Sequence, residues 1–153
     1  MGSNCYFNNE YDLVEGDKLA TSEVGKNDYL MHQFGRRAVN EILEHDMTKP
    51  MFLYLALTTP HTPLQVPSSY YSRCPNIVTS PAVGARIPDA SLLICAMVAV
   101  IDDLVYNVTE ALKLREMFEN TLIMFTSDNG GVTTLGSNNG PYRGGYSILL
   151  ANL

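Results

Sequence analysis

Two short polar side chains and a pair of glycines follow an uncharged stretch near the end of the sequence. The stretch covers residues 121–126, and Asp128, Asn129, Gly130 and Gly131 come just behind it. Carboxylate and amide oxygens are hard ligands, which calcium or magnesium prefers and zinc does not. Asp-Asn-Gly is also ordinary turn chemistry, in which the side chains cap the local backbone. Taken alone, these four residues favour the simple turn, because short motifs often arise by chance.

A histidine held between two prolines is the second candidate. The segment Pro60-His61-Thr62-Pro63 follows another uncharged stretch, at residues 51–57. Proline restricts both its own backbone and that of the residue before it, so His61 is expected on a stiff loop rather than on a helix. Its imidazole suits proton transfer or anion binding near neutral pH. The alternative, a loop histidine that caps local carbonyl groups, stays equally open at this point.

Each candidate follows a run that predicts a β-strand. Residues 51–57 and 121–126 are aliphatic, aromatic or β-branched without a charge, which is typical of strands buried on both faces of a sheet. In open α/β sheets, ligands bind outside the carboxyl ends of the strands. His61 and the Asp128–Asn129 pair therefore follow the predicted strands at the edge where such sheets carry their functional groups.

Helical periodicity predicts two helices beside these strands. The first follows an N-cap at Asp28 and ends near residue 43. The second covers roughly residues 90–117, and Asp102 and Asp103 on it are expected to face solvent or a loop. Its apolar stripe is expected to contain Leu92, Cys95, Ala99, Leu104, Val108, Ala111 and Leu112. Helices that alternate with buried strands indicate an α/β fold.

The remaining segments give weaker signals. Residues 67–73 could form a short helical turn, and residues 1–27 are expected to be mostly loop with one short strand near residues 11–14. His32 and His45 have polar neighbours on the first helix, which favours a solvated face for both.

Length and charge exclude several classes of protein. The chain has 153 residues, of which 46% are hydrophobic and 17% charged, so it is expected to form a single globular unit. Its formal net charge is −6 and it contains no basic run. These features argue against binding to nucleic acid or to anionic membrane surfaces. The longest uncharged apolar run, residues 92–101, is too short to span a bilayer.

The cysteines and one sequon bear on the compartment. Cys5, Cys74 and Cys95 are odd in number and lack metal-type spacing, so no disulfide framework is expected and Cys95 is predicted to be a buried or free thiol. Residues 1–10 are polar and do not form a signal peptide. Asn107-Val108-Thr109 is a glycosylation sequon, which hints at a secretory relative.

An ordered set of segments resembles the sulfatase family, and within it the arylsulfatase B subgroup. They are residues 49–57 (KPMFLYLAL), 60–67 (PHTPLQVP), 107–112 (NVTEAL) and 119–131 (ENTLIMFTSDNGG), followed by Pro141, Arg143 and Gly144. The resemblance covers most of the chain from about residue 13 to residue 144. A single Asp-Asn-Gly-Gly is a common motif, but the ordered set is specific and reverses the preference for a simple turn.

The resemblance implies a fold, a reaction and roles for several residues. The fold would be an alkaline-phosphatase-like α/β sandwich, of which this chain holds a fragment of the central mixed sheet with flanking helices. Sulfatases hydrolyse sulfate esters, sulfated glycans included, with a formylglycine nucleophile made from a Cys-x-Pro-Ser-Arg motif and with a calcium ion. Asp128 and Asn129 match two calcium ligands, and His61 matches the histidine that contacts the sulfate and assists the leaving group. Arg143 could reach the anionic substrate.

The sequence departs from the family pattern in three respects. It contains no Cys-x-Pro-Ser-Arg, and the aspartates that complete the calcium site in the family lie upstream of the matched region. The family's sulfate-binding lysine would fall at or near Tyr146, yet no lysine follows Lys113. Residues 145–153 form a tail outside the pattern.

We therefore expect a single partial sulfatase domain over residues 1–153, inactive on its own and weak in calcium binding. The family is lysosomal or secreted. One alternative is a complete sulfatase encoded by a longer gene, and another is a non-catalytic module that binds sulfated glycans. A related phosphotransferase is a further possibility, because the same superfamily fold serves phosphate esters.

Overall fold

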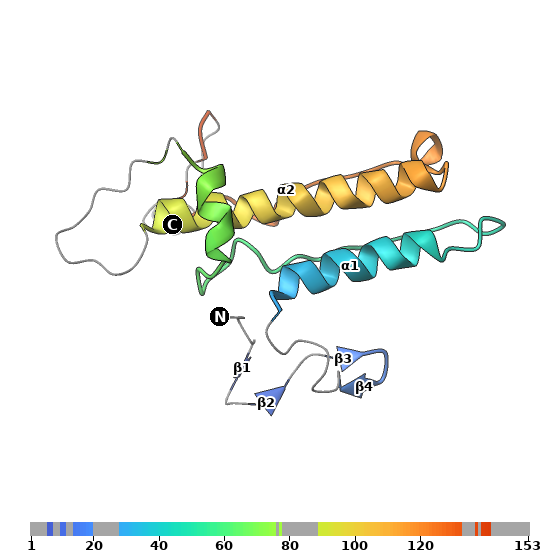
Figure 1. Cartoon of the computed structure of the whole chain (residues 1–153), viewed down its shortest axis with the longest axis horizontal. Coiled ribbons are helices and arrows are strands. Elements are labelled where there is room, and N and C mark those ends of the chain that lie inside the picture. Colours follow the sequence, from blue (N-terminus) through green and yellow to red (C-terminus); the bar gives the residue numbers. More distant parts are fainter. Residues whose placement is uncertain are drawn as a thin grey trace, which may run out of the picture.

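Two long helices organise the part of the chain that the structure describes, α1 (Leu30–Leu43) and α2 (Ala90–Leu114), which lie side by side (Figure 1). A short 3₁₀ helix, η1 (Ser68–Arg73), crosses one end of α2, and a second, η2 (Phe118–Asn120), follows α2 at its other end. η1 confirms the predicted helical turn. The computed structural model describes residues 6–7, 10–11, 14–19, 28–75, 77, 89–132, 137 and 139–141.

Helix α1 forms where the sequence predicts it, and its buried face follows the helical period. The buried positions are Met31, Gly35, Ala38 and Ile42. The predicted N-cap is wrong by one residue, because Tyr29 occupies the cap position and makes no side-chain capping bond there. The Asp28 carboxylate instead forms an ion pair with the guanidinium of Arg36, which lies eight positions further along the chain. An ion pair with a side chain two turns away competes with capping for the same carboxylate.

Helix α2 has an ordinary start and an abrupt end. Ser91 donates its backbone N–H to the Asp89 carboxylate at 2.8 Å, which satisfies one of the free amides of the first turn. The helix ends at Leu114, three residues before the predicted limit. Glu116 adopts a φ of +56°, a left-handed conformation that ends helices.

The buried face of α2 differs from the predicted stripe in its first half. Leu104, Ala111 and Leu112 are buried as expected, whereas Leu92, Cys95 and Ala99 are only partly buried. The fully buried residues of that half are Leu93, Ala96, Met97, Val100 and Ile101. Residues 92–101 are apolar all round, so the period alone could not show which face meets α1.

The helix pair encloses the core. One cluster surrounds Tyr29, Met31 and Val100, and a second surrounds Ile42, Ala111 and Leu112 toward the other end of the helices. Between them α1 approaches α2 closely, because a Cβ placed on Gly35 would lie 3.5 Å from Leu104 Cγ.

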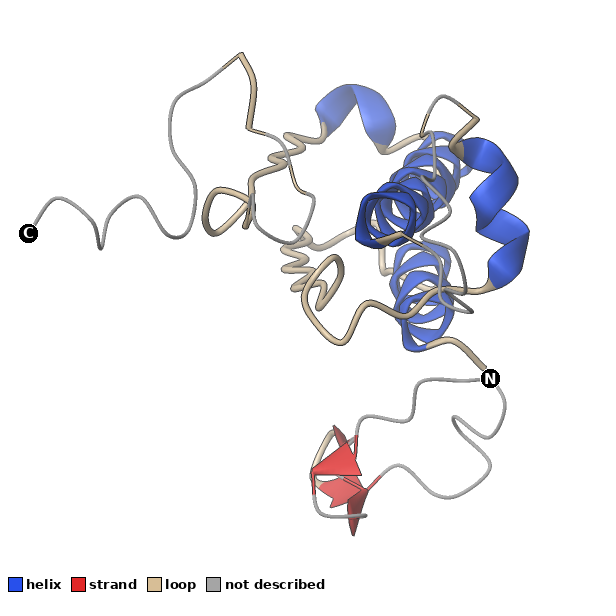
Figure 2. Ribbon diagram, turned by 90° about the vertical axis from the view of Figure 1, so that its left-hand side faces the viewer, coloured by secondary structure: helices blue, strands red, loops and turns tan. Residues whose placement is uncertain are grey.

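The two predicted strands are extended but unpaired. Residues 51–57 and 121–127 run back along the helices, and Figure 2 views both nearly end-on, on the same side of the helix pair. Within the described residues neither joins a β-ladder. Phe52 and Leu122 expose 93% and 86% of their surface, so the prediction of burial on both faces is wrong for this chain. A strand is buried on both faces only when neighbouring strands and a second layer cover it.

The first part of the chain contains more strand than predicted. β1 (Tyr6–Phe7) pairs antiparallel with β2 (Glu10–Tyr11), and β3 (Val14–Glu15) pairs with β4 (Lys18–Leu19). The expectation of loop with one strand near residues 11–14 is therefore wrong. Two-residue strands are too short to show a hydrophobic alternation, so periodicity could not predict them.

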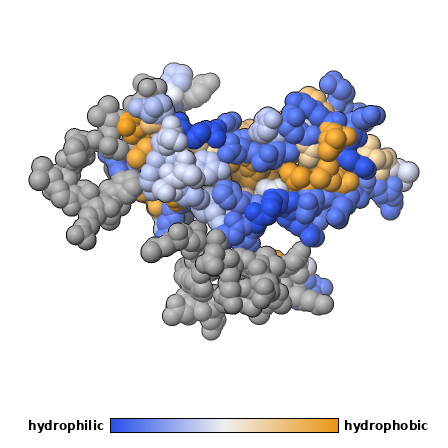
Figure 3. Space-filling view, in the orientation of Figure 1, coloured by the Kyte–Doolittle hydropathy of each residue, from blue (hydrophilic) through white to orange (hydrophobic). Residues whose placement is uncertain are grey.

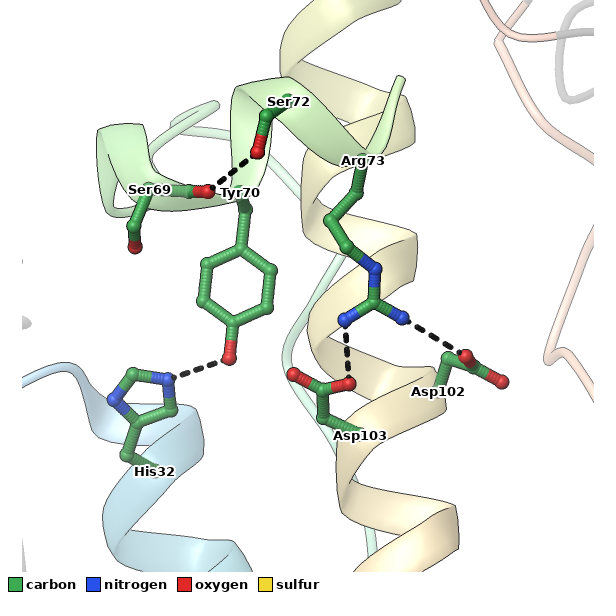
Figure 4. A network of polar contacts seen from close by, with 7 residues as sticks. All are labelled: His32, Ser69, Tyr70, Ser72, Arg73, Asp102 and Asp103. Carbon is green, nitrogen blue, oxygen red and sulfur yellow. Dashed lines mark hydrogen bonds and ion pairs between the residues drawn. The ribbon is translucent and has the colours of Figure 1, made fainter. Parts of the chain in front are cut away.

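The polar contacts drawn in Figure 4 and a disulfide link η1 to the helices. Arg73 donates to Asp103 at 2.7 Å and to Asp102 at 3.2 Å, which confirms the predicted contact of this acidic pair with a loop. Cys74 forms a disulfide with Cys95 on α2. The expectation of free or buried thiols is thus wrong for these two residues. The odd count required only that one cysteine stay unpaired, and η1 brings Cys74 onto the helix.

His32 on α1 also contacts η1. Its Nε2 lies 3.1 Å from the Tyr70 hydroxyl, and its ring meets the Tyr29 ring edge-on at 5.4 Å. The prediction of a solvated face is therefore wrong for His32, because η1 folds over it. Burial raises the pKa of the Tyr70 phenol, and the neighbouring Asp103 carboxylate raises it further.

The face of the helices away from the extended segments is largely hydrophilic. An apolar patch interrupts it along the α1–α2 seam (Figure 3), where a groove of about 680 Å³ is lined by residues of both helices. Helix α2 is long and apolar enough to cross a membrane, a property that it shares with core helices of soluble proteins. Here the helix packs against α1 and η1.

Candidate functional site

His61 lies on the loop that joins the first extended segment to η1. Its backbone N–H donates to the Thr58 carbonyl at 3.1 Å, which closes a tight turn. The side chain is exposed, and Nδ1 lies 2.7 Å from the Thr62 carbonyl oxygen. A carbonyl oxygen only accepts, so this short contact favours the tautomer with the proton on Nδ1, whereas the Thr62 hydroxyl, 3.5 Å from the same nitrogen, favours the other.

This contact leaves the other ring nitrogen of His61 available. In the tautomer with Nδ1–H on the Thr62 carbonyl, the neutral imidazole presents an unprotonated Nε2, and the imidazolium presents an Nε2–H donor. The same atom can therefore accept a proton or donate a hydrogen bond to an anion. The two interpretations that the sequence left open coexist: one nitrogen contacts a local carbonyl, and the other can do chemistry.

Asp128 and Asn129 lie on an exposed turn after the second extended segment. Ser127 Oγ donates to the Asn129 carbonyl at 2.7 Å, and Asn129 Nδ2 donates to the Gly130 carbonyl at 2.9 Å. Because Asn129 Nδ2 donates to the backbone, the other end of the amide, Oδ1, is turned away from that contact and can accept from another group. The Asp128 carboxylate is exposed as well. The corner thus offers two oxygen ligands of the kind that a hard cation takes.

A side-chain clamp that the sequence did not reveal supports this corner. Gly131 donates its N–H to Asn139 Oδ1 at 2.7 Å and accepts from Asn139 Nδ2 at 3.1 Å. The side-chain amide of Asn139 therefore makes the two hydrogen bonds to Gly131 that the backbone of a neighbouring strand would make. A Cβ on Gly131 would approach Ser137 Cβ to 2.6 Å, so only glycine fits without movement. In the sequence, the pair Gly130-Gly131 indicates the tight turn, but it does not indicate that Asn139 is its partner.

The two loops lie toward the same end of the molecule, the end near η1 (Figure 1). The extended segments run in the same direction, so their carboxyl ends lie toward the same end of the molecule. In the part of the chain described, His61 forms no hydrogen bond or ion pair with Asp128 or Asn129. No group of three or more acidic, histidine or cysteine side chains there could hold a metal ion. A shared calcium and sulfate pocket therefore stays a prediction. Arg143 and the tail from residue 145 lie outside the described residues.

The family model for sulfatases matches residues 3–149. This chain belongs to the sulfatase family. Membership implies the alkaline-phosphatase-like sulfatase fold, and it confirms the resemblance drawn from the ordered segments.

Individual relatives show how the length of this chain compares with that of other family members. Arylsulfatase J of Mus musculus is 35% identical over 134 residues, which are 88% of this chain and 21% of that protein. An uncharacterized sulfatase of Schizosaccharomyces pombe is 24% identical over 145 residues and is covered to 26%. The chain therefore spans about a fifth to a quarter of the length of the curated relatives it matches.

Two solved structures resemble this chain in backbone and in sequence. The crystal structure of Ps i-CgsB in complex with k-i-k-neocarrahexaose superposes with a TM-score of 0.65 at 36% identity, covering 77% of this chain and 24% of that one. A second structure of Ps i-CgsB gives a TM-score of 0.63. The sulfatase chain and its relatives therefore share the backbone arrangement as well as the sequence pattern.

Proposed function

We propose that this chain is part of the catalytic domain of an arylsulfatase-type enzyme that hydrolyses sulfate esters, sulfated glycans among them. The observation that carries the proposal is the family match over residues 3–149. It is supported by an exposed His61 whose Nε2 makes no hydrogen bond among the described residues. The name of arylsulfatase J and the oligosaccharide bound to Ps i-CgsB favour a sulfate ester or a glycan as substrate.

His61 is the residue proposed to contact the sulfate. When protonated, Nε2–H can donate to a sulfate oxygen or to the oxygen of the leaving group, while Nδ1–H stays on the Thr62 carbonyl. This arrangement leaves a single ring atom to exchange the proton. A donor aimed at the oxygen where negative charge develops stabilises the transition state more than the ground state.

Asp128 and Asn129 are proposed as two of the calcium ligands, and Arg143 as a contact to the anionic substrate. The two oxygens fit the chemistry of a hard cation, and the hydrogen bond from Asn129 Nδ2 to Gly130 leaves Oδ1 for the metal. A bound calcium ion would neutralise negative charge on the sulfate oxygens. Two ligands without further carboxylates should bind calcium weakly.

The nucleophile has no counterpart among these residues, because the sequence contains no Cys-x-Pro-Ser-Arg. We therefore expect no turnover of 4-nitrophenyl sulfate by the purified chain, with or without calcium. Clear calcium-dependent hydrolysis by the chain alone would contradict this expectation.

The proposed function is tested in a chimera in which residues 3–144 replace the matching part of mouse arylsulfatase J, so that the sulfate-binding lysine of the family is kept. The chimera should hydrolyse an aryl sulfate, and His61→Ala should lower kcat/KM by about 10²- to 10⁴-fold, the usual contribution of an acid–base group. His45→Ala is the matched control, because His45 Nε2 contacts the Lys49 carbonyl on the helix side of the molecule. Unchanged hydrolysis in a folded His61→Ala chimera would refute the role of His61.

A non-catalytic module that binds sulfated glycans is the second candidate. The tyrosine at position 146, near the place of a sulfate-binding lysine in the family, favours it. Binding of a sulfated oligosaccharide by the chain, without loss of sulfate from it, would support this function over hydrolysis.

The disulfide bears on the compartment. Disulfides persist in secreted and lumenal proteins and are rare in the cytosol, so the Cys74–Cys95 bond supports a lysosomal or secreted protein. Asn107 is exposed on α2 and carries the sequon Asn107-Val108-Thr109, which makes it the proposed glycosylation site. Release of a single glycan by an endoglycosidase, absent from Asn107→Gln, tests the assignment.

A further inference from the structure

One buried side chain touches both ends of the loop that carries His61. Tyr29, which is only 8% exposed, donates its hydroxyl proton to the Gln65 carbonyl at 3.0 Å. Thr59 is buried to the same degree and neighbours the Tyr29 phenol, although its hydroxyl makes no hydrogen bond among the described residues. Thr59 and Gln65 bracket His61, with Thr59 two residues before it and Gln65 four residues after it.

We propose that Tyr29 is a positioning residue for His61. Its phenol bonds to the Gln65 end of the loop 59–65, and its core cluster packs against Leu57 just before the other end. The catalytic meaning of this clamp rests on the proposed function of His61, whereas the clamp itself rests only on these contacts.

Tyr29 is held firmly enough to serve as an anchor. It caps α1 and belongs to a core cluster with Met31 and Val100, against which Leu57 and Val66 pack. Leu57 and Val66 lie just outside the two ends of the loop, so the apolar packing and the polar contacts act at the same points. A loop whose two ends are fixed on one rigid side chain has few conformations left.

The chemistry of the phenol suits this role at neutral pH. Burial raises the pKa of Tyr29, and the neighbouring Thr59 hydroxyl opposes part of that effect. The phenol therefore stays protonated and keeps its donor for the Gln65 carbonyl. The Thr59 hydroxyl is buried without a hydrogen bond of ordinary geometry, so its contact with Tyr29 is the polar interaction within its reach.

The clamp matters because the contact that favours one His61 tautomer is made with the adjacent residue, Thr62, and so depends on the local conformation of the loop. Nδ1 meets the carbonyl of the very next residue, and this geometry exists only while the loop keeps its turn at Thr58. If the loop loosens, both tautomers become accessible and Nε2 is no longer presented as the free atom.

The test reads the tautomer of His61 directly by NMR of the chain labelled with ¹⁵N-histidine, at a pH where the rings are neutral. Wild type should show His61 as the Nδ1–H tautomer. Tyr29→Phe keeps the ring and removes the hydroxyl, so the Nε2–H fraction should rise several-fold and the His61 amide should exchange with solvent at least ten times faster. Tyr70→Phe is the matched control, because it removes a hydroxyl that contacts His32, and it should leave His61 unchanged.

Each outcome decides the proposal. An unchanged His61 tautomer and amide exchange rate in Tyr29→Phe, with helical circular dichroism retained, would overturn it. Loss of the helical signal would also overturn it, because the hydroxyl would then support the helix pair rather than the loop. The tautomer is read without substrate, so a His61→Ala chimera that retains full activity would refute the proposed function and leave the clamp standing.

Discussion

At the scale of single residues, an ion pair between η1 and α2 shifts the pKa of a carboxyl group on α2. The hydrogen bond from Arg73 holds the pKa of the Asp103 carboxyl below its usual range, although partial burial acts in the opposite direction. A carboxyl with a depressed pKa in the folded state adds stability above its unfolded pKa, near 4, and loses that contribution as the pH falls through its folded pKa.

We predict that Asp103→Asn destabilises the chain at pH 7 and reduces the loss of stability on acidification below about pH 4. The side chain of Asp103 is 39% exposed, so the effect should not exceed about 1 kcal/mol. Urea unfolding at several pH values measures it. Asp102→Asn is the control, because Asp102 is 76% exposed and its contact with Arg73 is longer. An equal effect of the two substitutions would argue against a specific Arg73–Asp103 bond.

A second prediction concerns Gly35 in the middle of α1. A Cβ there would sit at ordinary contact distance from Leu104, 3.5 Å from its Cγ. Gly35→Ala should therefore stabilise the chain by about 0.5–1 kcal/mol, because alanine removes the entropic cost of glycine in a helix. The urea midpoint should rise at unchanged slope, whereas Ala38→Gly on the same buried face should lower it. A lower midpoint for Gly35→Ala would mean that the helices cannot accommodate one methyl group.

The site residues illustrate what a sequence reveals at this scale. Asp128, Asn129 and His61 could be found because their types and their positions after apolar runs indicate chemistry. Tyr29 and Asn139 could not, since each acts through a partner that only folding brings near: Gln65 is 36 positions from Tyr29, and Asn139 is eight from Gly131. Their roles depend on contacts rather than on residue type.

At the scale of elements, η1 depends on a covalent link. The Cys74–Cys95 disulfide closes a loop with a sequence separation of 21 residues. Closing a loop of this length lowers the entropy of the unfolded chain by an amount worth about 3 kcal/mol.

We predict that the double variant Cys74→Ser/Cys95→Ser loses about 3 kcal/mol of unfolding free energy. Cys5→Ser, which leaves the disulfide intact, should change little. Chemical denaturation with and without a reductant measures the difference: reductant should destabilise wild type and Cys5→Ser, and should have no effect on the double variant. Equal stability of the reduced and oxidised wild type would show that η1 is held by its polar contacts alone.

The elements also show where periodicity was sufficient and where it was not. Helix α1 alternates polar and apolar faces, so its bounds could be predicted. Of its apolar positions Ala38 and Ile42 are buried, whereas Leu30, Phe34 and Leu43 are only partly buried. The first half of α2 is apolar all round, and its inward face depends on where α1 lies. The stretches 51–57 and 121–126 were correctly expected to be extended, but their burial depends on strands that the described residues do not supply.

At the scale of the whole molecule, one side of the helix pair carries the two unpaired segments with exposed large apolar side chains. Phe52, Tyr54, Leu122, Met124 and Phe125 are among them. Extended backbone without neighbours and exposed apolar rows both favour association with other chains.

We predict that the chain self-associates through this side. The apparent mass in light scattering should rise with concentration between about 1 and 100 µM. Phe52→Lys combined with Met124→Lys should keep the chain monomeric, because desolvating two ammonium groups opposes the contact. Tyr106→Lys, on the opposite face of the helices, is the control and should associate as wild type does. Equal association of the control and the double variant would place the contact elsewhere.

The disulfide described above also determines how the chain responds to a protease. Residues 74 and 95 are joined through sulfur as well as through the backbone between them, so any one cut in that stretch leaves a ring opened but no piece released. The nicked protein would run as a single species on a non-reducing gel and separate into two bands once a thiol is added. Helix α1 with the His61 loop would thus stay attached to α2 and the Asp128 corner after such a cut.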